Sequence, residues 1–186
     1  MEPDSVYINE FLKNKNQKAF TELMKRYQDK VFRFCVAYSG NKADAEDLAQ
    51  EIFIKVFHNL GNFRSESLFG TWLYRIMINH CHNTYNSKRF RFRKLIQENS
   101  TIPDKGSDDP ESLVIAREKT KMIYEGLSLL EGNQRSVLIL RDIDGLTYEE
   151  ISELLHLKSG TVKSTLARAR IKVANYLKRR LYYELP

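Results

Sequence analysis

Apolar residues recur at helical spacing along most of this chain, and this period limits the fold more than any other feature of the sequence. The first run, between residues 20 and 38, consists of Phe20, Leu23, Met24, Tyr27, Val31, Phe34, Cys35 and Tyr38. A second run covers residues 45–60, and a third extends from about Ser67 to about Arg91. Gly40 and Gly61 stand where the first two helices would end. Because the sequence has no strand-length alternation with turn pairs, it predicts an all-α fold.

The helical pattern is interrupted between residues 97 and 109. This segment, QENSTIPDKGSDD, is polar and contains Pro103 and Gly106, a composition typical of a linker. Pro110 then suits the first turn of a new helix. We therefore expect two small helical domains, residues 1–96 and 110–186, joined by a flexible linker over residues 97–109.

The second domain contains a pattern typical of a helix-turn-helix motif. Thr147 and Glu150 form a capping box at the start of one helix, and residues 156–159 form a short turn before the next. Between Lys158 and Arg180 there are eight Lys or Arg residues and no acidic residue, whereas residues 142–153 hold five acidic residues and no basic one. The basic helix is predicted to enter a major groove, although a solvated basic helix in an ordinary bundle would show the same pattern. The candidate contacts are Lys158, Thr161, Lys163, Ser164, Thr165 and Arg168.

Aromatic and basic residues gather together in the first domain. Residues 63–92 include seven aromatic residues, and residues 67–97 include six Lys or Arg and no acid. Positive charge that follows a backbone, with rings that stack on unpaired bases, suits single-stranded nucleic acid. Asn79 and Asn83, four apart, project to one side of a helix. The candidate contacts are Phe63, Trp72, Tyr74, Arg75, Asn79, Asn83, Lys88 and Arg89. The competing interpretation is that these rings, Trp72 among them, are core residues.

Acidic residues crowd the first two turns of the helix over residues 44–57. They suit a helix N-terminus because they complement its dipole, and they suit equally a surface that docks on a basic partner. The sequence alone leaves these two interpretations open. The candidate docking residues are Asp44, Asp47, Gln50, Glu51 and Ile54.

Composition excludes several classes of protein. The longest apolar runs are too short to span a bilayer, and the first twenty residues lack the apolar core of a signal peptide, so we expect a cytoplasmic protein. Two cysteines rule out a disulfide scaffold, and the net charge of +6 favours an anionic partner. The sequence has no phosphate-binding glycine loop, and His80-Cys81-His82 places its two histidines on different sides of a helix. We expect neither an enzyme nor a bound cofactor. The competing functional interpretations are a conventional repressor or activator and a helical interaction module.

Three segments, in order and at matching spacing, resemble the extracytoplasmic-function (ECF) sigma factors of bacterial RNA polymerase. They are DAEDLAQEIFIKVF, FRSESLFGTWLYRIMINHCHNTYNSKRF and LTYEEISELL followed by KSGTVKSTLARAR. The resemblance implies that the helix at residues 44–57 docks on the clamp coiled coil of RNA polymerase, that residues 63–90 open and read the promoter −10 element, and that the helix-turn-helix reads the −35 element. It implies core RNA polymerase, promoter DNA and an anti-sigma factor as partners, and no small-molecule substrate.

Overall fold

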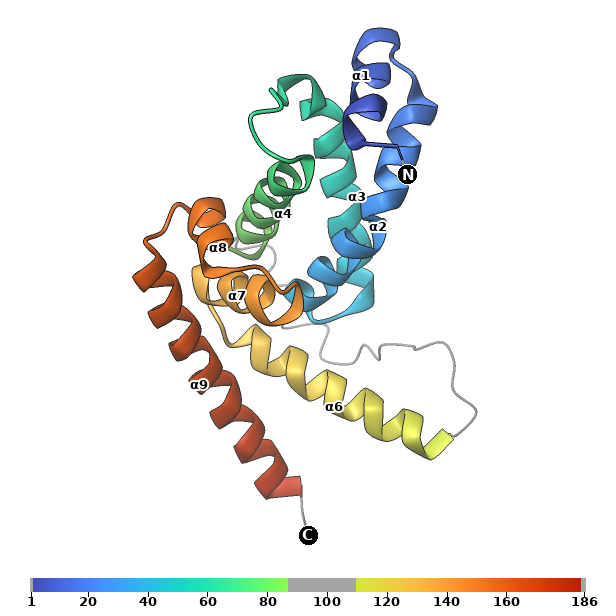
Figure 1. Cartoon of the computed structure of the whole chain (residues 1–186). Helices are drawn as coiled ribbons and strands as arrows, with labels where there is room; N and C mark the ends of the chain where they lie inside the picture. The colour runs from blue at the N-terminus through green and yellow to red at the C-terminus, as the bar shows by residue number, and fades with distance from the viewer. Residues whose placement is uncertain (1, 87–109, 185–186) are drawn as a thin grey trace.

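The computed structural model describes residues 2–86 and 110–184, and every regular element in these two ranges is a helix (Figure 1). This confirms the all-α prediction. The predicted linker, residues 97–109, lies outside the described residues.

Over residues 2–86 the first domain forms four α-helices and one short 3₁₀ turn. They are α1 (Asp4–Asn14), α2 (Gln17–Ser39), α3 (Lys42–Asn59), η1 (Leu60–Asn62) and α4 (Phe69–Asn86). The helix ends follow local chemistry: Asn41 caps α3 by accepting a hydrogen bond from the Asp44 amide at 2.8 Å, and Gly40 ends α2 with a left-handed φ of 81°. The apolar stripes of α2, α3 and α4 face one another in the core, where Phe34, Ile52 and Met77 are fully buried.

The second domain contains the predicted helix-turn-helix. Its elements are α6 (Pro110–Ser128), α7 (Asn133–Leu138), a π-helical turn η2 (Ile139–Ile143), α8 (Tyr148–Leu155) and α9 (Ser159–Glu184). His156 ends α8 in the left-handed conformation, with φ 52°, and its backbone amide donates a hydrogen bond to the Ser152 carbonyl. Helices α6 and α9 approach closely, since a Cβ atom on Gly126 would lie 3.1 Å from Val173 Cγ1. Both helices extend away from the rest of the molecule (Figure 1).

The two domains pack against each other and share one hydrophobic core. Helix α2 contacts α6, and α4 contacts α8, so the helix-turn-helix lies next to the aromatic and basic helix of the first domain (Figure 1). The side chain of Arg135 in α7 is only 5% exposed and donates to the Tyr38 carbonyl of α2 at 2.9 Å. The two domains therefore contact each other directly through buried side chains.

The capping box that opens α8 gives a test of local stability. Thr147 Oγ1 accepts from the Glu150 amide at 3.2 Å, while Glu150 Oε2 accepts from the Thr147 amide at 2.7 Å. We expect Thr147→Ala to lower the free energy of unfolding by about 1 kcal/mol, because it leaves the Glu150 amide without its cap. Urea denaturation checks this, with Thr120→Ala on the exposed surface of α6 as the matched control. Equal losses in the two variants would contradict the cap assignment.

Candidate nucleic-acid and polymerase interfaces

One flank of α3 offers a continuous solvent-facing surface. Asp47, Gln50 and Glu51 are solvent-facing, and Ile54 is 57% exposed, although it is a large apolar side chain. Asp44 differs from the prediction. Its side chain is 8% exposed and accepts from Asn41 Nδ2 at 2.8 Å, so it completes the cap of α3 and is not offered to a partner.

A contact between two side chains connects the α3 flank to α4. Glu51 Oε2 lies 2.8 Å from Nε2 of His80, which is 9% exposed and projects from α4. Burial lowers the pKa of His80 from its usual value, and the nearby Glu51 carboxylate opposes that change. The contact brings the exposed Glu51 side chain of the α3 flank next to α4.

A cluster of three aromatic rings forms where the loop between η1 and α4 meets that helix. The ring centres of Phe63, Phe69 and Trp72 lie 5.4–5.7 Å apart. Phe69 is buried, whereas Phe63 and Trp72 are half-buried. The Trp72 ring therefore packs on the core and stays partly accessible, and its stacking on an unpaired base stays a prediction.

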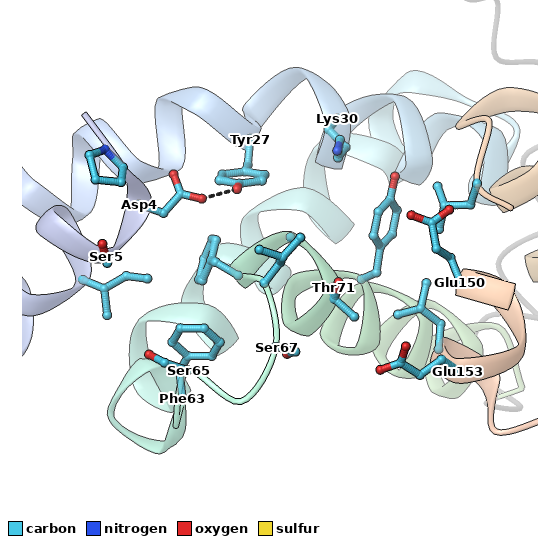
Figure 2. A pocket seen from close by; sticks show the side chains of 18 residues that line it. Asp4, Ser5, Tyr27, Lys30, Phe63, Ser65, Ser67, Thr71, Glu150 and Glu153 are labelled. Carbon is cyan, nitrogen blue, oxygen red and sulfur yellow. Dashed lines mark hydrogen bonds between the residues drawn. The ribbon is translucent and has the colours of Figure 1, made fainter. Parts of the chain in front are cut away.

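A hollow of about 580 Å³ opens beside this loop (Figure 2). The loop lines it with Phe63, Ser65 and Ser67, and α8 lines it with Glu150 and Glu153. In Figure 2 the loop residues and the two glutamates lie at opposite ends of the hollow, with residues of α1 and α2 along its other edge. Ser65 has a φ of 57°, a backbone geometry that turns the loop sharply at this point.

The outer face of α4 carries the predicted amides. Asn79 and Asn83 are exposed one turn apart, as the spacing predicts. Tyr74 differs from the prediction that it stacks on an unpaired base, because its ring is only 5% exposed and its hydroxyl donates to Asp144 Oδ2 at 3.1 Å. Lys88 and Arg89 lie outside the described residues. Arg75 is accessible in part, and its Nη2 lies 3.7 Å from Glu153 Oε1.

The second helix of the helix-turn-helix presents a polar face to solvent. The residues Thr161, Lys163, Ser164 and Arg168 are exposed on it, and Lys158 lies in the turn before it. Two contacts hold this face: Lys163 Nζ lies 5.4 Å from the centre of the Tyr148 ring, and Arg168 Nε donates to the Ser164 carbonyl at 3.3 Å.

Thr165 differs from the prediction of a base contact, because it turns inward beside Val162 and Leu166 and is only 7% exposed. A shallow hollow of about 290 Å³ runs beside it, between α9 and the start of α7. Asn133 and Gln134 line this hollow together with Thr165, Arg168 and Lys172, and the Lys172 ammonium donates to Gln134 Oε1 at 3.1 Å. Asn133 and Gln134 were not predicted to lie beside the recognition helix, because they carry no charge and precede the motif.

The His-Cys-His run of α4 is engaged in contacts other than metal binding. His80 contacts Glu51, and Cys81 is fully buried against Cys35, whose hydrogen bond raises the pKa of the Cys81 thiol. Both cysteines are free thiols. In the part of the chain that the structure describes, no three His, Cys, Asp or Glu side chains gather as metal ligands. None of the helices over residues 2–86 and 110–184 is both long and apolar enough to cross a bilayer.

Comparisons with known proteins identify the family of this chain. The family model of sigma-70 region 2 matches residues 23–91, and that of sigma-70 region 4 matches residues 120–173. The ECF RNA polymerase sigma-E factor of Haemophilus influenzae is 34% identical over 167 residues, which cover 86% of this chain and 88% of the relative. The protein of the same name from Escherichia coli K12 is 35% identical over 179 residues, covering 92% and 93%.

A solved structure shares the fold. It is the sigma factor RpoE of Bartonella quintana in complex with the anti-sigma factor NepR, with a TM-score of 0.63 and 24% identity over 87% of this chain and 98% of that chain.

The first domain has an acidic helix flank beside an aromatic loop, and the second has a helix-turn-helix. Together with the two family matches, these domains define a sigma-70-type transcription factor. Within that class the chain belongs to the ECF sigma factors, and it acts in promoter recognition and transcription initiation with RNA polymerase.

Proposed function

We propose that this sigma factor divides its work among three surfaces: the α3 flank binds core RNA polymerase, the loop and outer face of α4 hold the melted −10 element, and the exposed face of α9 reads the −35 element. The observation that carries this proposal is the exposed polar face of α9 on a capped helix-turn-helix, in the same chain as an exposed acidic flank. The role is non-catalytic and is exercised in the cytoplasm, where polymerase and promoter DNA are found.

Run-off transcription tests this function directly. Purified core RNA polymerase is given genomic DNA fragments with and without the protein, and the transcripts are sequenced. We expect new transcripts with defined 5′ ends only when the protein is present. A transcript pattern identical to that of core polymerase alone would contradict the proposal.

The energy of DNA melting supports a polymerase partner. Unstacking costs about 1.4 kcal/mol for each base-pair step, so a bubble of about ten steps costs well over 10 kcal/mol. Stacked bases contribute about 1–3 kcal/mol each, and Phe63 and Trp72 are the partly accessible rings at the loop. One or two captured bases cannot hold such a bubble open. The remaining stabilisation must come from a larger assembly, to which the α3 flank would attach this chain.

The α3 flank gives a specific prediction. We expect Asp47→Arg to weaken binding to core polymerase about tenfold or more, because it places a cation where an exposed carboxylate faces a basic partner. Fold stability should be unchanged, since the Asp47 side chain lies on the exposed surface of α3. Calorimetric titration with core polymerase measures the affinity, and Asp29→Arg on exposed α2 is the control of equal charge change. Equal affinity of both variants would remove Asp47 from the interface.

Recognition of the −35 element is assigned to Lys163, Ser164 and Arg168, with Lys158 and Thr161 as further contacts. The first three side chains lie on one exposed face near the start of α9, where a recognition helix meets base edges. An anti-sigma factor is proposed as a further partner. The support is family membership and the fold shared with RpoE of Bartonella quintana, which was solved with NepR.

A further inference from the structure

The acidic segment at residues 142–153 belongs to none of the three surfaces proposed to bind polymerase or DNA. It precedes the basic helix and holds Asp142, Asp144, Glu149, Glu150 and Glu153. Asp142 bonds Arg170 within its own domain, with Oδ1 2.6 Å from Nη2. Asp144, Glu150 and Glu153 instead face the first domain, where the two glutamates line the hollow beside the aromatic loop (Figure 2).

Two carboxylates of this segment contact successive residues of α4. Asp144 Oδ2 accepts from the Tyr74 hydroxyl at 3.1 Å, and Glu153 Oε1 lies 3.7 Å from Arg75 Nη2. Asp144 also lies near two cations of α2, Lys30 and Arg33. Burial raises the pKa of Asp144, and these two cations act in the opposite direction by favouring its charged form. Lys30 Nζ in turn lies 5.3 Å from the centre of the Tyr74 ring. Acidic groups of the second domain therefore lie beside an aromatic ring, a guanidinium and an ammonium of the first domain. Groups of these kinds bind a nucleic acid strand.

A buried guanidinium also contacts both domains. Arg135 donates from Nη1 to the Tyr38 carbonyl at 2.9 Å and from Nη2 to the Ser128 carbonyl at 2.7 Å. These carbonyls belong to the last turns of α2 and α6, where carbonyl groups have no partner within the helix and the helix dipole is negative. Its guanidinium also lies 5.2 Å from the ring centre of Tyr38 and 4.7 Å from that of Tyr85. One side chain thus caps a helix in each domain.

We propose that the free protein is held closed by its own acidic segment, in which Asp144 binds Tyr74 and Glu153 masks Arg75, one of the candidate single-strand contacts of α4. The masking role rests on the proposed function of the outer face of α4. A closed state that leaves about 10% of molecules open lowers the apparent affinity for a strand about tenfold.

The test compares two variants with the same loss of charge in the full-length chain. Asp144→Ala with Glu153→Ala removes both contacts, whereas Glu118→Ala with Glu149→Ala removes two exposed acids, one on α6 and one on α8, outside the contact. Small-angle X-ray scattering measures the radius of gyration, and fluorescence anisotropy measures binding of a mixed-sequence single-stranded oligonucleotide. We expect the first variant alone to expand and to bind the oligonucleotide about tenfold tighter than the wild type.

The outcomes separate the closed contact from the proposed function. An unchanged radius of gyration would overturn the closed contact whatever the oligonucleotide does. Equal tightening in both variants would mean that net charge alone attracts the strand, which also overturns masking. Expansion with no oligonucleotide binding by any variant would contradict the single-strand function of α4 and with it the masking role, while supporting the contact itself.

A charge exchange isolates the Arg75–Glu153 pair from folding effects. Glu153→Arg places two guanidinium groups together, and we expect it to expand the molecule. Adding Arg75→Glu restores an opposite pair with reversed polarity, and the scattering profile should return to that of the wild type. Expansion that persists in the double variant would overturn the pair as part of the contact.

Discussion

Arg135→Ala is expected to lower the free energy of unfolding by about 3 kcal/mol and to make the two domains unfold separately. The substitution leaves the Tyr38 and Ser128 carbonyls without their donor, and a buried acceptor left unpaired costs about 1–3 kcal/mol. Burial lowers the pKa of the Arg135 guanidinium, but arginine stays charged near neutral pH, so both bonds are charge-assisted. Differential scanning calorimetry should show one transition in the wild type and two in the variant.

Arg141→Ala is the matched control for this result. Arg141 lies in the second domain, where its Nη1 donates to the Leu146 carbonyl at 2.7 Å and its guanidinium lies 4.9 Å from the centre of the Tyr148 ring. All three residues belong to one domain, so the loss of this side chain should destabilise that domain without uncoupling it from its neighbour. Two transitions in the Arg141 variant as well, or one in the Arg135 variant, would contradict the bridging role of Arg135.

Lys163→Ala combined with Arg168→Ala is expected to weaken binding to promoter duplex about 100-fold. A good base contact is worth about 1–3 kcal/mol, and both side chains lie on the exposed face of α9 with their orientations held by Tyr148 and the Ser164 carbonyl. The probe is a duplex that carries the −35 element of a promoter found by run-off transcription. Anisotropy at fixed salt gives the affinity, and titration over a salt series shows whether a phosphate contact is lost.

Lys119→Ala combined with Lys121→Ala removes the same charge from the exposed surface of α6. We expect this control to bind the duplex nearly as tightly as the wild type, because α6 is not part of the recognition face. If the control falls as far as the α9 variant, the basic surface acts through net charge and not through the recognition helix.

Features that depend on neighbouring residues were predictable from the sequence. The apolar period predicts α2, α3 and α4, and the pair Thr147 and Glu150 predicts the start of α8, because helix formation and capping involve residues three or four apart. The structure confirms both, and His156 takes a left-handed conformation at the predicted turn. The short helix α1 was not predicted, since its apolar residues Ile8 and Phe11 repeat over little more than one turn.

The direction in which individual site residues face was less predictable. Asp44, Tyr74 and Thr165 have the residue types of their proposed sites, yet each is buried. Asp47, Asn79 and Arg168 have similar types and are exposed. Residue type and helical spacing predict which face of a helix a residue lies on. Residues at the edge of that face are buried by neighbouring helices, whereas residues at its centre are exposed to solvent. Which edge is covered depends on the packing of helices that are distant in the sequence.

The amino-acid sequence by itself determined the helices, the helix-turn-helix and the separation of basic from acidic segments, because these are local patterns of polarity and capping. Only the tertiary structure decided that the two domains pack together, since that packing depends on pairs such as Arg135 with Tyr38 and Tyr74 with Asp144, which lie 97 and 70 residues apart. Such pairs leave no period in a sequence. They form because a buried guanidinium, carbonyl or carboxylate must find a partner once water is excluded.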